Sequence, residues 1–344
     1  MSLLGKFDQM SLIEDLEADY LYVKGREDKN NSSYDGLWGK RLINWFDKLS
    51  SNGRLDANKL KVFRQTAPLI SEVPRNPHFH NPILSIIYKT LRMEGYKKTC
   101  LLNYEKLAKD DSLDWNSFSE VGKPLYIECD NRKFNERSLR HLRTVSVIKK
   151  KIPLNAGDYV LDIGGGYAQF SMCLRRGFPK IKNIVIDFPE QLLLARYYIH
   201  TLDPNCRVNN IRQTYAADDL LENINDFDVL LLPADSYDII NKLKLKLVCN
   251  FSSYGEMPLS VFEEYQRQPS ISKAEYFFTI NRLDSFPTYN NRMSILNYLS
   301  STNRIEHLEV SPIWDYHYSS YTKFWVKKQA YLSRNFELIE RRAS

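Results

Sequence analysis

The chain has 344 residues, of which 43% are hydrophobic and 13% aromatic, so it has enough apolar side chains for a packed core and is not of the disordered class. Its formal net charge is +6, from 48 basic and 42 acidic residues that are interspersed along the sequence. This balance permits an anionic partner such as a phosphorylated sugar carrier, nucleic acid or a membrane surface, but it does not require one. The length suits one large domain with a sizeable appendage.

The cellular compartment is suggested by the cysteines and by the first twenty residues. The five cysteines are scattered without a C-x-x-C pair, which indicates free thiols in a reducing compartment. No apolar run is long enough to span a bilayer. The acids Glu14, Asp15, Glu17 and Asp19 have the wrong charge for a signal peptide. We therefore expect a cytoplasmic protein without a membrane span.

Residues 1–120 are predicted to form an N-terminal, mainly helical region. Apolar residues recur at helical spacing from Leu12 to Tyr20, and again from Leu37 to Leu49. A proline-rich passage further on contains His78 and His80. Two histidines that alternate along a strand can bind one metal ion, but the prolines favour a loop and no third ligand is visible. No metal site is predicted.

A β-α-β unit with a glycine turn lies in the middle of the chain. An apolar run leads through Asp162 into the triplet Gly164, Gly165 and Gly166, a helical pattern follows, and a second apolar run ends at Asp187. Such units build right-handed parallel sheets. Glycine is expected here because a ligand must approach the backbone closely at the N-terminal end of the helix.

The spacing of this unit favours a nucleoside ligand. Asp187 lies 21 residues beyond Gly166, where a carboxylate at the end of the second strand can accept both hydroxyls of a ribose. The dinucleotide fingerprint G-x-G-x-x-G would need a third glycine where Gln169 stands, which disfavours a nicotinamide-dependent dehydrogenase. With an acid two residues before the first glycine, the turn is similar to motif I of class I S-adenosylmethionine (SAM) methyltransferases.

Later apolar runs complete the sheet. Further strands are predicted at 208–212, 227–232, 245–250, 276–280 and 323–327. The predicted fold class is α/β, with a Rossmann-like, doubly wound, mostly parallel seven-stranded sheet and the N-terminal helical region as an appendage. The second domain would be 121–344. Its stretch 281–321, rich in Asn, Ser and Tyr, is expected to be a lid-like insertion.

Residues that follow the strands are candidates for the ligand site, because open parallel sheets bind ligands outside the carboxyl ends of the strands, near the point where strand order reverses. If 227–232 is the fourth strand and lies next to the first, then Pro233 and Asp235 border the transferred methyl group. Asp218, after the third predicted strand, would bind the adenine amino group or else cap the next helix.

A basic helix is predicted over 138–150, directly before the first strand of the sheet. Its proximity to the glycine turn makes Arg137, Arg140 and His141 candidates to reach the ligand. A solvated helix face is the simpler interpretation of this basic stretch.

Four runs resemble the sugar O-methyltransferase family, a branch of the class I SAM-dependent methyltransferases: LDIGGGYAQF, VIDFPEQLLLARYYI, NFSSYGEM and EYFFTINR. The resemblance extends over residues 120–341. It implies SAM as the cofactor and a sugar, nucleotide sugar or glycan acceptor, methylated on a hydroxyl during synthesis of a cell-surface polysaccharide. Ala168 and Tyr254 depart from the family pattern, which often has glycine and leucine there.

The resemblance also implies a role for each matched position. Asp162 and the glycine triplet would line the methionine moiety of SAM, Asp187 the ribose and Asp218 the adenine edge. The residues that would face the acceptor are Ser253, Glu256 and Met257. Neighbouring residues complete the candidate sets: Phe188 and Pro233 for the cofactor, Tyr254 and Arg140 for the acceptor.

Methyl transfer from a sulfonium is an in-line displacement, which a protein accelerates mainly by orientation. A sugar hydroxyl also needs a base to remove its proton. The candidates are Glu256 after the strand 245–250, His317 within an aromatic cluster that can stack on a sugar ring, and Asp235. No spacing of metal ligands supports a metal-assisted route.

Two other functions remain open. An RNA methyltransferase would fit the positive charge and the basic helix, but the N-P-P-Y signature and any RNA-binding module are absent, which disfavours nucleic acid as the partner. A non-catalytic SAM-binding subunit could recruit a partner enzyme through the N-terminal helices. The sequence leaves the oligomeric state open, a homo-oligomer included.

Overall fold

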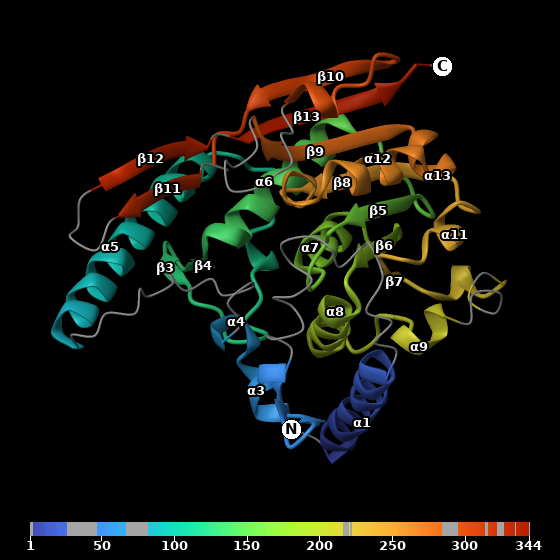
Figure 1. The fold of residues 1–344 in the computed structure, drawn as a ribbon, viewed down its shortest axis with the longest axis horizontal. Coiled ribbons are helices and arrows are strands. Elements are labelled where there is room, and N and C mark those ends of the chain that lie inside the picture. Colours follow the sequence, from blue (N-terminus) through green and yellow to red (C-terminus); the bar gives the residue numbers. More distant parts are fainter. Residues whose placement is uncertain are drawn as a thin grey trace.

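The computed structural model describes residues 3–25, 47–66, 82–215, 220, 222–283, 295–313, 316–321, 327–333 and 335–343. Figure 1 shows a central sheet with helices packed on it, α1 at one end of the molecule and the C-terminus at the other. The long helix α5 (Pro82–Leu107) lies along one side.

Seven strands form the central sheet, in the order β10-β13-β9-β8-β5-β6-β7. Five of them are parallel: β5 (Tyr159–Ile163), β6 (Lys182–Asp187), β7 (Val229–Pro233), β8 (Leu245–Phe251) and β9 (Tyr276–Arg282). The last two strands on the β9 side, β13 (Asn335–Arg342) and the edge strand β10 (Asn303–Val310), pair in antiparallel fashion. The order reverses at β5, which pairs with β6 on one side and β8 on the other. The predicted doubly wound, mostly parallel sheet is confirmed.

The prediction of a strand at 208–212 is wrong. Val208 makes an isolated bridge with Val229, and the chain then enters the short helix α9 (Ile211–Thr214). Asn210 caps this helix, since its side chain accepts from the Gln213 amide while Gln213 bonds back. As a result, the predicted fourth strand is the third along the chain, at the edge beyond β6.

The C-terminal part of the sheet also differs from the prediction. Asn303–Val310 is the edge strand β10, so the stretch 281–321 is not wholly an insertion. Most of the strand predicted at 323–327 lies outside the described residues, and β13 is the last strand of the sheet. The described residues of the predicted lid also contain α14 (Ile295–Tyr298) and β11 (Tyr316–Tyr321), which pairs with β12 (Lys327–Ser333) in a separate hairpin.

Helices cover both faces of the parallel strands, because successive side chains of each strand point to opposite faces and both sets are apolar. On one face lie α6 (Glu136–Lys151), α7 (Gln169–Gly177) and α8 (Pro189–Leu202), packed on alternate strand residues such as Val160 and Val185. The other face carries α11 (Tyr237–Ile240), α12 (Leu259–Arg267) and α13 (Pro269–Ser272), packed on the intervening residues such as Leu161 and Ile184.

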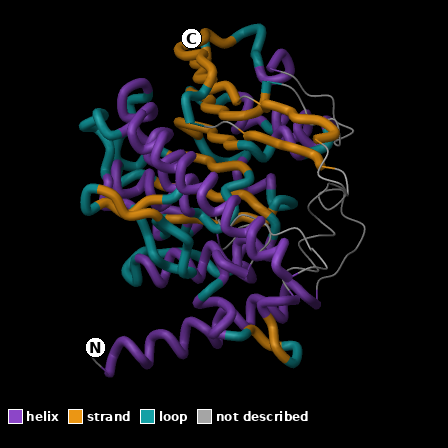
Figure 2. Tube along the Cα trace, turned by 90° about the vertical axis from the view of Figure 1, so that its left-hand side faces the viewer, coloured by secondary structure: helices purple, strands orange, loops and turns teal. Residues whose placement is uncertain are grey.

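The described part of the N-terminal region is mainly helical, with α1 (Leu3–Gly25), α3 (Ala57–Lys61) and α4 (Phe63–Thr66) before α5. Figure 2 shows α1 projecting from the base of the molecule towards the N-terminus. Its buried residues Leu16 and Tyr20 belong to the same apolar cluster as α8. The predicted helix at 37–49, apart from a short 3₁₀ turn at Asp47–Leu49, and the histidines His78 and His80 lie outside the described residues.

Short elements complete the chain. The hairpins are β1 (Ser50–Ser51) with β2 (Arg54–Leu55), and β3 (Ile127–Cys129) with β4 (Arg132–Phe134); the remaining 3₁₀ turns are Trp115–Ser117, Ile224–Asp226 and Tyr254–Glu256. All five cysteines are free thiols, as predicted. Within the described ranges, no helix combines the length and the apolar character that crossing a membrane would require.

Candidate ligand site at the glycine turn

The glycine turn connects β5 to α7 at the carboxyl end of the sheet. Gly164 and Gly166 have positive φ angles of 73° and 59°, and Ala168, the residue before α7, is also left-handed with φ 63°. The Gly164 amide donates to the Ile186 carbonyl over 2.7 Å, so the turn is anchored to the neighbouring strand β6. The backbone therefore crosses directly over the ends of both strands.

The three glycines are needed for different reasons. A Cβ on Gly164 would lie 2.2 Å from Ser253 Oγ, and a Cβ on Gly165 would lie 2.6 Å from Asp162 Oδ2. A Cβ on Gly166 would meet no atom of the described residues within 4 Å. At the first two glycines, protein side chains occupy the space that a Cβ would need, which is a reason for glycine that does not involve a ligand. Only at Gly166 is the turn open.

Asp187 ends β6 beside this open position. Its Oδ2 accepts from the Gly166 amide over 2.7 Å, and its Oδ1 accepts from the Phe188 amide over 2.7 Å. Burial raises the pKa of Asp187 to about 6, although the two hydrogen bonds from backbone amides act to lower it. Carboxylates with this placement can accept ribose hydroxyls, so a bound diol would add hydrogen bonds to a group that is already oriented.

Asp162 lies beneath the turn and is 3% exposed. Burial and, to a smaller extent, the charge of Asp187 raise its pKa to about 7, although the Ser171 hydroxyl at 3.3 Å acts to lower it. Two carboxyls that repel each other in a buried place favour binding of a group with positive charge or with several N–H and O–H donors.

The end of β8 is tied to the end of β5 by Asn250. Its Nδ2 donates to the Ile163 carbonyl over 2.9 Å, and its Oδ1 accepts from the Tyr254 amide over 3.0 Å. The Ser253 hydroxyl donates to the same Ile163 carbonyl over 3.0 Å. This places Ser253 against the glycine turn, where its hydroxyl supports the backbone of the turn.

A second asparagine extends the network into β9. Asn281 donates to Asn250 Oδ1 over 2.9 Å and accepts from the Gly255 amide over 3.2 Å. The next residue, Arg282, forms an ion pair with Glu256 at 3.1 Å, and both side chains are largely buried. Glu256 thus lies in the turn after β8, the strand next to β5, with its carboxylate oriented by a guanidinium.

The strand order corrects the placement of Pro233 and Asp235. Their strand, β7, is separated from β5 by β6, so they do not lie beside the first strand as predicted. Pro233 is paired with Asp187, and the Ala234 amide donates to the Asp187 carbonyl over 3.0 Å. Pro233 therefore borders the Asp187 end of the site. Asp235 is exposed, and the basis for a catalytic role at the methyl group is lost.

Other predicted residues have mixed placements. Tyr254 is 4% exposed and packs against Phe262 in the core, which argues against acceptor binding. Phe188 precedes α8, and Met257 packs partly buried at the edge of the core. The backbone of His317 belongs to the separate β11–β12 hairpin, opposite Leu332. Asp218 lies outside the described residues.

The basic helix α6 is buried on the side that faces the turn. Arg140 is 8% exposed and paired with Glu136, so the interpretation of the whole stretch as a solvated face is wrong. That interpretation holds for the exposed lysines Lys149, Lys150 and Lys151 at its far end. The half-buried Arg137 lies over the ring of Tyr167, the residue that follows Gly166.

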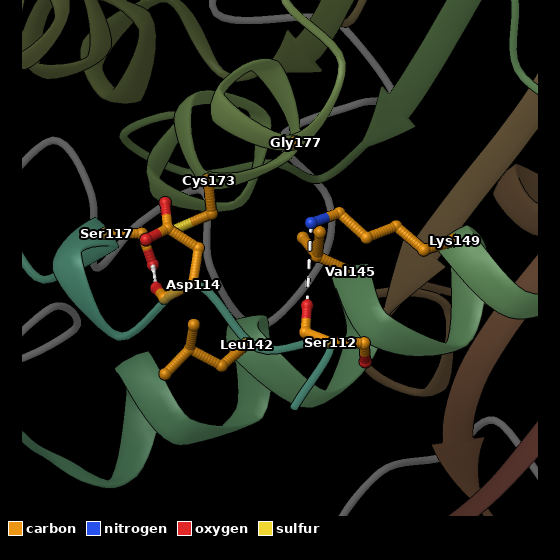
Figure 3. Close-up of a pocket in the computed structure, with 8 residues that line it drawn as sticks. All are labelled: Ser112, Asp114, Ser117, Leu142, Val145, Lys149, Cys173 and Gly177. Carbon is orange, nitrogen blue, oxygen red and sulfur yellow. Dashed lines mark hydrogen bonds between the residues drawn. The ribbon is translucent and has the colours of Figure 1, made fainter. Parts of the chain in front are cut away.

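A small pocket elsewhere is not the ligand site. Figure 3 shows it between α6 and α7, lined by side chains such as Leu142, Lys149 and Cys173, with Gly177 at its rim. Gly177 ends α7, so the pocket lies away from the glycine turn, which precedes that helix. The Lys149 ammonium reaches across it to the Ser112 carbonyl at 3.5 Å.

One group of possible metal ligands occurs among the described residues, formed by His307, Glu309 and Glu337 at the edge of the sheet. Arg143 already pairs with both carboxylates, at 2.6 Å to Glu309 and 3.4 Å to Glu337. Ser311 also donates to Glu337 over 2.6 Å. A cation would have to displace the guanidinium, so this group is an ion-pair network.

Sequence reasoning missed several residues that shape the site. Asn250 interrupts the otherwise apolar run of β8, and this polar residue in a buried strand was a usable signal. Asn281 and Arg282 end β9 in the same way. Arg64, which reaches Tyr167 from α4, gave no signal, because nothing in the sequence near it indicates proximity to the turn.

Comparison with known proteins gives only a general likeness. No protein-family model matches the chain, and no curated protein matches it. Among solved structures, TehB from Haemophilus influenzae resembles it with a TM-score of 0.38 and 9% sequence identity, over 58% of this chain and 62% of TehB. A SAM-dependent methyltransferase from Aquifex aeolicus resembles it with a TM-score of 0.33 and 14% identity, over 61% of this chain and 100% of that protein. The pyocyanin biosynthetic protein PhzM matches with TM-score 0.34 and 10% identity, over 60% of this chain.

The match spans 56% of PhzM and 62% of TehB, less than two thirds of either. Scores this low assign neither an activity nor a cofactor.

Proposed function

We propose that the chain is a SAM-dependent methyltransferase. The observation that carries the proposal is the pairing of Gly166 with Asp187, in which an open glycine backbone and an oriented carboxylate meet where strand order reverses. The residues fit the nucleoside part of SAM, with Asp187 as acceptor for the ribose hydroxyls. Asp162 would lie at the methionine end, beneath the turn.

SAM supplies an electrophilic methyl group when bound. The protein's part is to place the acceptor oxygen in line with that group and to remove its proton. The turn after β8 suits this task, because β8 is next to β5 and Glu256 is held there by Arg282. We propose Glu256 as the base, with Met257 beside it on the acceptor side.

Calorimetry with SAM, S-adenosylhomocysteine and NADH tests the cofactor. Asp187→Ala should weaken binding of SAM and S-adenosylhomocysteine by about 1–3 kcal/mol, because it removes the ribose acceptor. The matched control is Asp226→Ala, an exposed acid before β7. Unchanged affinity in Asp187→Ala, or binding of NADH instead, would refute the proposal.

For the acceptor, we propose a hydroxyl of a sugar in a cell-surface polysaccharide or its activated precursor. The support is the resemblance of the glycine turn, of the passage 250–257 after β8 and of the end of β9. The experiment is transfer of labelled methyl from SAM into separated glycan, nucleotide-sugar, RNA and protein fractions. Label in the RNA fraction would show that the acceptor is a nucleic acid and not a sugar. Absence of label despite SAM binding would favour a non-catalytic subunit.

A further inference from the structure

Four basic side chains gather beside the glycine turn. Arg137, Arg140 and His141 share one side of α6, since residues at spacings of three and four are neighbours on a helix. Arg64 joins them from α4, 73 residues earlier than Arg137. Figure 1 shows α6 between α5 and α7, with α4 below. We call these four residues the basic cluster.

The cluster is in contact with the turn itself. The guanidinium carbons of Arg64 and Arg137 each lie 5.6 Å from the centre of the Tyr167 ring. Tyr167 is 1% exposed and directly follows Gly166, the open position of the turn. Two cations are therefore fixed on the residue adjoining the proposed cofactor site.

His141 connects the cluster to the acceptor side. Its ring lies 5.9 Å from that of Phe170, whose ring in turn lies 4.7 Å from that of Phe251. Phe251 is the last residue of β8, immediately before the loop that carries Glu256. The cluster thus extends from the turn towards the end of β8, which is the side away from Asp187.

Two members of the cluster, Arg64 and Arg140, are buried, whereas Arg137 and His141 are half-buried. Arg64 is 0% exposed and donates to the carbonyls of Ser119 and Val121, and Arg140 is 8% exposed and paired with Glu136. Burial lowers the pKa of His141 well below its usual value, and the charges of the three arginines lower it further. The imidazole is therefore neutral, and its buried Nδ1 has no hydrogen-bond partner among the described residues.

We propose that the basic cluster binds an acidic group of the acceptor, a carboxylate or a phosphate. This inference rests on the proposed function and specifies its substrate class. Guanidinium groups match the oxygens of both anions, and low exposure strengthens the attraction. An acid held there would place the rest of the acceptor towards the end of β8.

Titration of the protein with inorganic pyrophosphate and with glucuronate, at constant ionic strength, tests the proposal. The protein is first saturated with S-adenosylhomocysteine, so that the position bound by the cofactor's own carboxylate is already occupied when the probe is added. Binding is followed by calorimetry and by the ring resonances of His141. We expect one of the two probes to bind and to shift those resonances, and Arg137→Gln to weaken binding about tenfold, as expected for loss of one charge-assisted hydrogen bond.

Lys151→Gln is the matched control, because it removes one charge from the exposed end of the same helix. It should leave the affinity for the probe unchanged. Arg137→Gln should leave the affinity for S-adenosylhomocysteine unchanged as well. Pyrophosphate binding points to a phosphorylated acceptor, and glucuronate binding alone points to a sugar acid.

Three results would overturn the proposal. The first is binding of neither probe. The second is probe binding that disappears once S-adenosylhomocysteine is present, together with weaker S-adenosylhomocysteine binding in Arg137→Gln, which would assign the cluster to the cofactor's carboxylate. The third is equal weakening in Lys151→Gln. If S-adenosylhomocysteine does not bind at all, the proposed function fails, and titration of the free protein still tests the cluster.

Discussion

The Gly166 amide donates a hydrogen bond to Asp187 Oδ2 over 2.7 Å, joining residues 21 positions apart across the ends of β5 and β6. This bond fixes the carboxylate beside Gly166, where a Cβ would meet no atom of the described residues within 4 Å. The same bond explains why the acid is oriented before any ligand arrives. A preoriented acceptor loses less entropy on binding.

The ionisation of Asp187 should control cofactor affinity. Its pKa is raised to about 6, so the carboxylate is mostly ionised above that pH and mostly protonated below it. We expect the affinity for S-adenosylhomocysteine to rise as the pH increases from 5 to 7 and to level off beyond. Calorimetry across this range checks the expectation. In Asp187→Asn, which cannot ionise, this part of the pH dependence should be absent, and its persistence would assign the titration to another group.

Asp162 should make the ligand-free protein less stable as the pH rises. Its pKa is about 7 when folded and near 3.8 when unfolded, so between these values the folded state holds a proton that the unfolded state has lost. The stabilisation is therefore complete below about pH 4 and is lost as the pH rises through about 7, a change on the order of a few kcal/mol.

Urea unfolding of wild type and Asp162→Asn at pH 5 and pH 8 measures this effect. The asparagine can still accept from Ser171 but carries no charge. The variant should lose less stability between the two pH values than wild type does. Parallel pH curves would contradict the assignment.

Glu256 should matter for turnover and not for cofactor binding. Glu256→Gln keeps the size of the side chain but removes the base, so we expect the transfer rate to fall about 100-fold or more. The affinity for SAM, measured by calorimetry, should stay the same. Glu264→Gln, on α12, is the control. Full activity in Glu256→Gln would remove it from the candidates and would direct attention to His317.

The β-α-β unit was predictable because its signals are local. Glycines, an apolar run on each side and an acid at a fixed distance are read within about 30 residues, and the structure has β5, α7 and β6 at those positions. The strand at 208–212 was mispredicted for an equally local reason. The capping pair Asn210 and Gln213 starts the short helix α9 at that position.

Which strands and side chains lie next to one another was harder to predict than where the helices and strands occur in the sequence. Because a strand was predicted at 208–212, the strand before Asp235 was counted as the fourth and was expected beside β5. In the structure that strand, β7, lies beyond β6. The contact of Arg64 with Tyr167 depends on how distant segments pack, which no local pattern records. A polar residue within an apolar strand, such as Asn250 in β8 or Asn281 in β9, is the sequence feature that indicates such a contact.

Gly164 should be more sensitive to substitution than its backbone conformation alone requires. An alanine Cβ there would lie 2.2 Å from Ser253 Oγ, in addition to the strain of a positive φ. We expect Gly164→Ala to lower the free energy of unfolding by about 2–4 kcal/mol. Gly157 also has a positive φ, of 85°, but open space around it, so Gly157→Ala should lose only about 1 kcal/mol.

Urea denaturation of both variants separates the clash from the strain. Adding Ser253→Gly to Gly164→Ala removes the obstructing side chain and should recover part of the loss. Equal destabilisation by the two alanine variants would show that the contact with Ser253 is not tight in solution.

Asp19 should be the residue that holds α1 on the rest of the protein. Its side chain is 0% exposed, pairs with Arg196 and Arg212 at 2.8 Å each, and accepts from the Ile211 amide over 3.1 Å. Asp19→Ala would leave the buried Arg196 without this partner, so we expect a loss of about 3–5 kcal/mol in the free energy of unfolding. Asp15→Ala removes an acid that is 39% exposed and pairs with the same two arginines, and it should lose less than about 1 kcal/mol.

Urea denaturation measures both losses, and limited proteolysis reports whether α1 is released. Asp19→Asn keeps the acceptor for Ile211 but removes the charge, so its loss should fall between the other two. If Asp19→Ala and Asp15→Ala are equally mild, the ion pairs do not hold α1. The apolar contacts of Leu16 and Tyr20 with the cluster around α8 would then be sufficient to dock it.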